Sequence, residues 1–327
     1  MAVLVLVKVL ITGGAGFIGF HLAGFLIQQG HKVDICDNMF RGRMDADFKK
    51  LIENKNVNYA NCDLTNASDL EKLDKDYDYV YHLAAINGTK FFYEIPHKVL
   101  RVNILTAINI LDWFVETKCR KILFPSSSEA YAGTMAIYKI PIPTPEDVAL
   151  SIEDVNNERR SYAGSKIAGE LLFINYAKKH KFDMSIVRYH NIYGPRMGNE
   201  HVIPEFILRI LKKENPFRMF GGKETRAFCY VDDAIKATQL VMESKKTNMN
   251  IINIGNDKEE ISMIRLAKKL FAVSGYNASI DTREPPKGTA LRRCPSIQKL
   301  KNLTGFCPSV DLNQGLKITY EWYKNNP

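Results

Sequence analysis

The sequence predicts an α/β fold in which a doubly wound parallel sheet carries a smaller C-terminal α+β lobe. The first observation is an apolar run over residues 3–11 that ends at a glycine cluster, with an apolar helical pattern following at once from Phe17. The second is that short apolar or β-branched runs alternate with helical patterns as far as residue 188. Such alternation is typical of parallel sheets with helices on both faces.

The composition, 46% hydrophobic and 25% charged, is that of an ordinary globular protein, and 327 residues are enough for two lobes. The net charge of +9 comes from basic residues in short scattered groups, so we expect a site for an anionic small molecule and no nucleic acid. No run approaches the roughly 18 apolar residues of a membrane span, so none is expected. The six cysteines are scattered without a C-x-x-C pair, which predicts no metal site and a cytoplasmic location.

The first strand leads into a glycine-rich turn with Gly13, Gly16 and Gly19 at regular spacing. Glycine suits this turn because it permits unusual backbone angles, close approach of a phosphate and tight contact between helix and strand. The helix that begins with Phe17 and Ile18 would direct its free N–H groups at that phosphate. The turn therefore predicts a phosphate-binding loop.

The next elements place an acid at a useful distance from this loop. A helix is expected from Phe17 to Gln29 and a strand from His31 to Cys36, and Asp37 follows that strand, 18 residues after Gly19. A carboxylate there can accept hydrogen bonds from an adenosine ribose and would repel a 2′-phosphate, which favours NAD over NADP. Arg41 and Arg43 keep NADP open, and Asp37 with Asn38 could instead form only a turn at the end of the strand.

The remaining elements of the first domain follow in order. Strands are expected at 57–61, 79–83, 121–124 and 185–188, and helices at 69–73, 96–118 and 161–181. The proline-rich segment 134–157 is expected to be a long loop beside a site.

Beyond residue 188 the pattern loosens, with short helices expected at 202–213 and 261–273 and a strand at 251–254. We expect a first domain of residues 1–188 together with about 230–257. Residues 189–229 and 258–327 would then form the smaller lobe.

Tyr162 and Lys166 lie four residues apart and therefore share one face of the helix over 161–181. An ammonium near a phenol favours the phenolate, so the pKa of Tyr162 is expected to fall from about 10 towards neutrality. Such a phenolate can act as a general base on a sugar hydroxyl. Ser127, at the end of the preceding strand, could hold the same oxygen.

These residues together resemble a known family. The chain carries Gly13-x-x-Gly16-x-x-Gly19, His82-Leu83-Ala84-Ala85, the run Ser126 to Tyr131, Tyr162-x-x-x-Lys166, Arg188 to Arg196 (R-Y-H-N-I-Y-G-P-R) and Thr225 to Asp233 (T-R-A-F-C-Y-V-D-D). In this order they are similar to the extended short-chain dehydrogenase/reductases, in particular to their NAD-dependent nucleotide-sugar epimerase/dehydratase branch. The resemblance runs from Val9 to about Tyr323.

The resemblance implies a Rossmann domain that holds NAD and a C-terminal lobe that grips a nucleoside diphosphate sugar. Its cofactor-binding residues would be Gly13, Gly16, Phe17, Ile18, Gly19, Asp37, Asn38, Asp63, Leu64, Leu83, Ala84, Ala85, Asn103, Tyr162 and Lys166. Its catalytic residues would be Tyr162, Lys166, Ser127 and Glu129, and its substrate-binding residues Ser128, Arg159, Asn191, Arg226 and Arg292. Tyr162 would take the proton of the sugar 4-hydroxyl while hydride passes to NAD, giving a transient 4-keto sugar.

The reaction after this first step is open. A UDP-glucose 4-epimerase-like activity is the first expectation, and a UDP-glucuronate decarboxylase-like activity is the alternative. Ser128, where dehydratases of the branch have an aspartate, disfavours 4,6-dehydration. Glu129, together with Arg159 three residues before the tyrosine, is similar to the decarboxylases, although Glu129 could also cap a helix or anchor the loop. The segment 87–93, expected as a substrate-facing loop, departs from both groups.

Two further expectations concern the protein as a whole. By resemblance, the helices over 96–118 and 161–181 would pair with their copies in a homodimer, although core packing explains their apolar faces equally well. A non-catalytic NAD-binding scaffold is the alternative from another class. The intact Ser127, Tyr162 and Lys166 disfavour it.

Overall fold

The computed structural model describes residues 6–285 and 290–326, and the start of the expected first strand, residues 3–5, lies outside the described residues. Its centre is a seven-stranded sheet in the order β3-β2-β1-β4-β5-β6-β11, and every neighbouring pair of strands is parallel. The strands are β1 (Lys8–Thr12), β2 (Lys32–Asp37), β3 (Val57–Asn61), β4 (Tyr79–His82), β5 (Lys121–Ser127), β6 (Asp183–Tyr189) and β11 (Asn250–Ile254). This order, which reverses direction beside β1, confirms the doubly wound fold.

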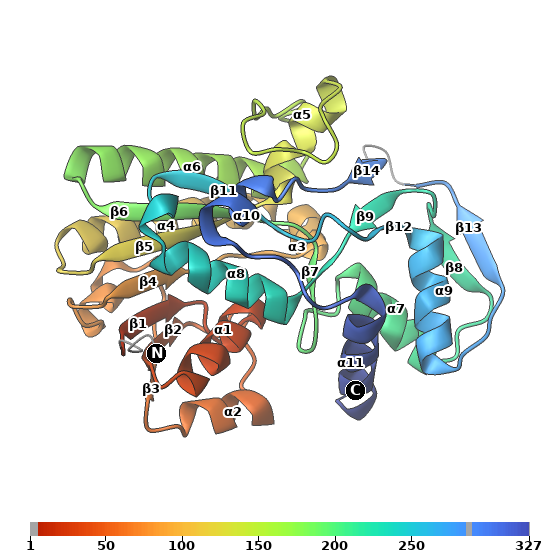
Figure 1. Cartoon of the computed structure of the whole chain (residues 1–327), viewed down its shortest axis with the longest axis horizontal. Helices are drawn as coiled ribbons and strands as arrows, with labels where there is room; N and C mark the ends of the chain where they lie inside the picture. The colour runs from red at the N-terminus through yellow and green to blue at the C-terminus, as the bar shows by residue number, and fades with distance from the viewer. Residues whose placement is uncertain (1–5, 286–289, 327) are drawn as a thin grey trace.

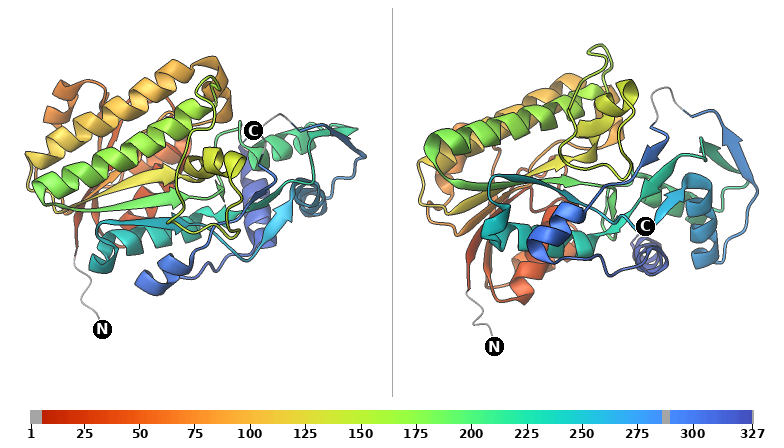
Figure 2. Two further views of the ribbon diagram at one scale, coloured as in Figure 1. Left: turned by 90° about the horizontal axis from the view of Figure 1, so that it is seen from above. Right: turned by 45° about the horizontal axis from the view of Figure 1, so that its top comes forward.

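Two pairs of helices cover the two faces of the sheet (Figures 1 and 2). One face carries α1 (Phe17–Gln28) and α8 (Val231–Glu243), and the other carries α4 (Pro96–Val115) and α6 (Arg160–His180). The central strand β1 is largely apolar because both of its faces are buried: Val9 packs in the core beneath α1 and α8, whereas its neighbour Leu10 packs in the core beneath α4 and α6.

Short elements connect these layers and differ in part from the sequence expectations. They are α2 (Ala46–Ile52), η1 (Ala67–Lys72), α3 (Thr89–Glu94), η2 (Ser128–Tyr131), α5 (Ala132–Ile137) and η3 (Lys245–Thr247). The loop expected over 134–157 thus begins as helix, the loop expected over 87–93 contains α3, and the short helix near 69–73 is a 3₁₀ turn. α3 forms because Phe92 is buried against Val99 and Tyr162, a tertiary contact that six residues of sequence do not reveal.

The remaining chain forms helices and small sheets beyond the carboxyl ends of the main strands (Figure 1). The helices are α7 (Val202–Leu211), α9 (Met263–Ser274), α10 (Gln298–Thr304) and α11 (Leu312–Asn325). The small sheets pair β7 (Ile192–Tyr193) with β10 (Cys229–Tyr230), β8 (Phe217–Phe220) with β13 (Ile280–Arg283), and β9 (Thr225–Ala227) with β12 (Glu260–Ser262) and β14 (Arg292–Arg293). α7, α9 and α11 pack together, whereas α10 lies against α8 and β11.

The division into two domains stays a prediction; within it, β11 lies on β6 and so returns to the main sheet. The contacts of α10 show that the chain crosses back to the sheet once more, within the range assigned to the smaller lobe. Among the described residues, none of the helices combines the length and apolar character needed to cross a membrane.

Candidate active site

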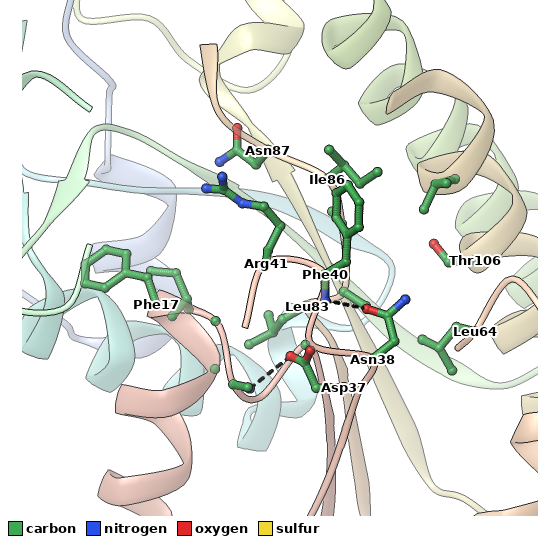
Figure 3. A pocket seen from close by; sticks show the side chains of 18 of the residues that line it. Phe17, Asp37, Asn38, Phe40, Arg41, Leu64, Leu83, Ile86, Asn87 and Thr106 are labelled. Carbon is green, nitrogen blue, oxygen red and sulfur yellow. Dashed lines mark hydrogen bonds between the residues drawn. The ribbon is translucent and has the colours of Figure 1, made fainter. Parts of the chain in front are cut away.

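A cavity of about 660 Å³ opens at the carboxyl ends of β1, β2 and β4 (Figure 3). Ligands of doubly wound sheets bind at this edge, where the strand order reverses. The cavity lining includes most of the residues that the sequence assigned to a cofactor: Gly13, Gly16, Phe17, Ile18, Gly19, Asp37, Asn38, Asp63, Leu64, Leu83, Ala84 and Ala85. The structure therefore brings these separate segments together.

The glycine turn is so closely packed that side chains do not fit. Gly13 has a φ of +72°, and a Cβ there would lie 2.7 Å from the backbone nitrogen of Ala84. A Cβ on Gly19 would lie 2.6 Å from the Cα of Gly14 and even closer to the carbonyl oxygen of Gly13. Gly16 is the N-cap residue of α1, and no side chain caps the first N–H groups of this helix. Because residues 16–19 line the cavity, these N–H groups are available to a phosphate there.

Asp37 ends β2 and presents its buried carboxylate to the cavity. Its oxygens accept hydrogen bonds from the backbone nitrogens of Ala15 at 3.0 Å and Met39 at 2.8 Å. Burial raises the pKa of Asp37, although both hydrogen bonds oppose this shift. Asn38 accepts a hydrogen bond from the backbone of Phe40 at 3.0 Å and so shapes the following turn (Figure 3).

Asn103 is the one predicted cofactor residue outside the catalytic pair that does not line the cavity. Its side chain accepts a hydrogen bond from the backbone nitrogen of Ile86 at 2.7 Å and donates to the carbonyl oxygen of Ile86 at 3.1 Å and to Ser165 at 3.1 Å. Asn103 thus fixes the loop after β4, which does line the cavity.

The sequence named Arg41 and the segment 87–93, but it did not predict the contacts that join them at the cavity. Arg41 forms an ion pair with Glu200 from the loop before α7, and its guanidinium lies 4.7 Å from the ring centre of Phe91. In Figure 3 the Arg41 side chain is directed toward Asn87. Phe40 lies under the ammonium of Lys98 at 4.6 Å. These contacts join residues far apart in the chain, so no local pattern could have indicated them.

Ser127, Tyr162 and Lys166 meet beside the cavity, where the end of β5 approaches the first turn of α6. The Ser127 hydroxyl lies close enough to the phenol of Tyr162 to affect its pKa, and the rings of Tyr162 and Phe92 stack with their centres 4.9 Å apart. The Lys166 ammonium lies 5.5 Å from the Tyr162 ring centre and donates a hydrogen bond to the carbonyl of Pro125 at 2.7 Å. All three predicted reacting groups are therefore in one place.

The expected fall in the pKa of Tyr162 is not observed in this structure. Burial raises that pKa, and the nearby hydroxyl of Ser127 only partly offsets the effect. The ammonium of Lys166 is directed at a backbone carbonyl rather than at the phenol oxygen, so its charge acts on the phenol only from a distance. Burial in turn lowers the pKa of Lys166 to about 7.

Glu129 lies at the centre of a cluster of arginines, next to Ser127. Its carboxylate forms ion pairs with Arg293 and, at 3.6 Å, with Arg159. Burial alone would raise the pKa of Glu129, but the two guanidiniums outweigh it and lower the pKa to about 2. Burial and the nearby Arg293 lower the pKa of Arg226 to about 10, which places Arg226 in the same cluster.

Of the two adjacent arginines, Arg293 and not Arg292 joins this cluster, and the assignment of Arg292 to the substrate stays a prediction. β14 lies parallel to β9, with Arg293 beside Arg226 and Arg292 beside Thr225. Because side chains alternate along a strand, Arg293 joins Arg226 and Glu129, whereas the exposed Arg292 pairs with Glu260 at 2.6 Å. Sequence alone does not show which of two adjacent arginines faces a site.

The other two predicted substrate residues lie nearby. Ser128 is buried in η2, between Ser127 and Glu129. Asn191 has a φ of +44°, and its amide donates a hydrogen bond to the carbonyl oxygen of Ala227 at 3.0 Å. Asn191 therefore links the end of β6 to the strand that carries Arg226.

Fold and site together define a dinucleotide-dependent enzyme with a tyrosine–lysine pair. The residues fit NAD because side chains are excluded from Gly13 and Gly19, where a phosphate would approach, and because the Asp37 carboxylate faces the same cavity. The chain belongs to the NAD dependent epimerase/dehydratase family, whose model matches residues 9–255. It is an NAD-dependent enzyme of the nucleotide-sugar epimerase, decarboxylase and dehydratase class.

Relatives within this family carry two different activities in their names. The UDP-N-acetyl-alpha-D-glucosaminuronate decarboxylase of Bacillus cytotoxicus is 35% identical over 97% of this chain and 98% of its own. The UDP-glucuronate 4-epimerase of Thermodesulfobacterium geofontis is 30% identical over 97% of this chain and 96% of its own. The crystal structure of UDP-glucuronic acid 4-epimerase from Bacillus cereus in complex with UDP-glucuronic acid and NAD has a TM-score of 0.85 at 28% identity, over 98% of this chain and 100% of that chain.

Proposed function

We propose that the protein is an NAD-dependent decarboxylase of a UDP-linked uronate. The observation that carries this proposal is the arginine cluster around Glu129, next to Ser127 and Tyr162. Arg159 and Arg293 pair with the Glu129 carboxylate, and the buried Arg226 lies close enough to Arg293 and Glu129 for their charges to affect its pKa. The cluster therefore has an excess of positive charge at the point where the sugar would lie.

Two buried nitrogen atoms of this cluster are a further reason to expect an anionic ligand. The Nε atoms of Arg159 and Arg293 are buried and have no hydrogen-bond partner among the described residues. A buried donor without a partner is unfavourable by roughly 1–3 kcal/mol, so a ligand that accepts from it gains affinity. Guanidiniums suit carboxylates because two N–H groups can bind two oxygens. A uronate carboxylate would satisfy this site better than a neutral hydroxymethyl group.

The chemistry follows from where the groups lie. The glycine turn and Asp37 would hold NAD, which would supply a reversible hydride acceptor for C4 of the sugar. Tyr162, with the Ser127 hydroxyl beside it, removes the proton of the 4-hydroxyl, and the positive charge of Lys166 favours the phenolate from a distance. A carboxylate on C5 is then β to a ketone and can leave as CO₂, and a proton takes its place at C5.

A 4-epimerase is the second candidate. It is favoured by the names of relatives such as that from Thermodesulfobacterium geofontis, and it needs only Ser127, Tyr162 and Lys166. An epimerase that acts on a uronate could use the same arginines. The two reactions differ in their products, because only decarboxylation changes the mass of the sugar.

The arginine cluster can be tested with Arg159→Ala and Glu129→Gln, with Arg120→Ala as the matched control. Arg120 is an exposed arginine paired with Asp78. Loss of one partner of a buried charge pair costs about 2 kcal/mol or more, so kcat/KM for UDP-glucuronate should fall at least ~30-fold in the first two variants and stay unchanged in the control. Full activity of both cluster variants would refute the role of the cluster.

We also propose that the protein is a cytoplasmic homodimer. α4 and α6 lie side by side on one face of the molecule (Figure 2), and Leu100 and Leu171 are exposed on these helices. Pairing of this face with a second copy would cover both leucines. A monomer in light scattering at micromolar concentration would exclude the dimer.

A further inference from the structure

A buried carboxylate, Glu170, lies beneath the Ser127–Tyr162–Lys166 group and takes no part in the proposed reaction. It is on α6, one turn after Lys166, and is 3% exposed. We propose that Glu170 is a positioning residue, which holds the end of β5 and the Lys166 ammonium in the arrangement that Tyr162 requires. This inference rests on the roles proposed above for Ser127, Tyr162 and Lys166.

Glu170 and Lys166, both on α6, are each hydrogen-bonded to the end of β5. Oε1 of Glu170 accepts a hydrogen bond from Ser126 at 2.5 Å. Ser126 lies between Pro125, whose carbonyl accepts from the Lys166 ammonium at 2.7 Å, and Ser127, whose hydroxyl lies close enough to the Tyr162 phenol to lower its pKa. Glu170 and Lys166 thus hold two adjacent residues of β5, Ser126 and Pro125, from one helix. A shift of that strand end would move Ser127 relative to Tyr162.

Arg188, on β6, fixes Glu170 from the other side. It donates to both carboxylate oxygens of Glu170, from Nε at 2.8 Å and from Nη2 at 2.7 Å. Its remaining nitrogen, Nη1, donates to the hydroxyl of Tyr131 at 2.7 Å and to the carbonyl of Glu146 at 2.9 Å. Tyr131 ends the short turn that carries Glu129, so one buried guanidinium holds both halves of the site.

Glu170 also acts on Lys166 through its charge. On the same helix the ammonium lies near the charge of Glu170 and 5.5 Å from the ring centre of Tyr162. The Phe124 ring on β5, 4.9 Å away, is uncharged. From β4 the ammonium faces His82, which burial and this ammonium keep neutral, with a pKa of about 3. The guanidinium of Arg188 on β6 is paired with Glu170. Burial lowers the pKa of Lys166, and the charge of Glu170 opposes this shift. Replacing Glu170 by a neutral residue would therefore lower the pKa of Lys166 further.

The test compares Glu170→Gln with Asp233→Asn in the full chain with NAD bound. Asp233 is a matched buried carboxylate that holds the backbone of Ser309 and Val310 at 2.9 Å, away from the site. Glu170→Gln should lower kcat about tenfold with little change in KM, and it should move the alkaline limb of the kcat profile to lower pH by about one unit. Asp233→Asn should lower the melting temperature and leave the pH profile in place.

Ser126→Ala distinguishes the positioning role of Glu170 from its electrostatic role. It removes the hydrogen bond between Ser126 and Glu170 and leaves the Glu170 carboxylate in place. It should lower kcat without moving the alkaline limb. An unchanged kcat and alkaline limb in Glu170→Gln would overturn the proposal. If Glu170→Gln does not fold, unchanged kcat in Ser126→Ala would overturn it.

A titration without substrate distinguishes failure of this inference from failure of the proposed reaction. NMR of the chain labelled with ¹³Cε-lysine reports the ionisation of Lys166, and its signal is assigned by its loss in Lys166→Met. In Glu170→Gln this signal should titrate about one pH unit lower, whichever sugar the enzyme uses. A signal that titrates at the same pH in both proteins would refute the electrostatic role of Glu170.

Discussion

At the scale of single residues, the account depends on Tyr162 as the general base. Tyr162→Phe should lower turnover about 100-fold or more, because the phenol oxygen that removes the proton is lost. NAD should still bind, since the glycine turn and Asp37 are untouched and Phe would keep the stacking on Phe92. Turnover and NAD binding can be measured on the same preparation. Undiminished turnover would assign the base to another group.

The position of a single residue can be predicted from sequence where a local motif fixes it. It cannot be predicted where it depends on how distant segments pack in the fold. Tyr162 and Lys166 share a helix face at any register, so their proximity follows from spacing alone. Arg293 could not be chosen over Arg292, because that choice depends on how β14 lies against β9. The pKa of Tyr162 was wrongly expected to fall, because spacing does not reveal burial or that Lys166 binds the carbonyl of Pro125.

At the scale of elements, the contact of α1 with the glycine turn has a matched test. Gly19→Ala places a Cβ against the backbone of Gly13 and Gly14, whereas Gly24→Ala, on the same helix, meets Leu51 only at 4.0 Å. Gly24→Ala should raise the free energy of unfolding by up to about 1 kcal/mol, because alanine favours helix. Gly19→Ala should lower it and weaken NAD binding. Calorimetry and NAD titration check both, and equal behaviour of the two variants would contradict the packing.

The end of α8 provides a second test at this scale. The buried Lys121 donates hydrogen bonds to the carbonyl oxygens of Val241 and Ser244 and to the hydroxyl of Thr247. Burial lowers the pKa of Lys121 to about 8, whereas the unfolded chain keeps this proton to about 10.4. Unfolding therefore takes up a proton between these pH values, so this lysine makes the free energy of unfolding rise with pH.

Lys121→Met lacks this effect. Relative to the variant, the unmutated protein should gain about 2 kcal/mol in free energy of unfolding between pH 7.5 and pH 10.4. Denaturant titrations of both proteins across that range measure the difference. Parallel pH dependence would show that Lys121 is not buried with a lowered pKa.

At the scale of the whole molecule, the sequence predicts the central sheet but not the long-range contacts that complete the site at its edge. The six strands expected up to residue 188 all occur, since buried parallel strands leave a strong apolar pattern. The ion pair of Arg41 with Glu200 joins loops from distant parts of the chain, and the Glu170–Arg188 pair joins a helix to a strand. Such contacts depend on the assembled fold, which is why the outer parts of the site were missing from the sequence prediction.

The central claim also concerns the whole molecule: the enzyme binds a UDP-linked uronate and removes its carboxylate as CO₂. Mass spectrometry of the enzyme with UDP-glucuronate, UDP-N-acetylglucosaminuronate and UDP-glucose, with NMR of any product of unchanged mass, tests it most directly. We predict that at least one uronate gives a nucleotide sugar lighter by one CO₂, while UDP-glucose is left unchanged. Epimers of unchanged mass from the uronates or from UDP-glucose, with no release of CO₂, would contradict it.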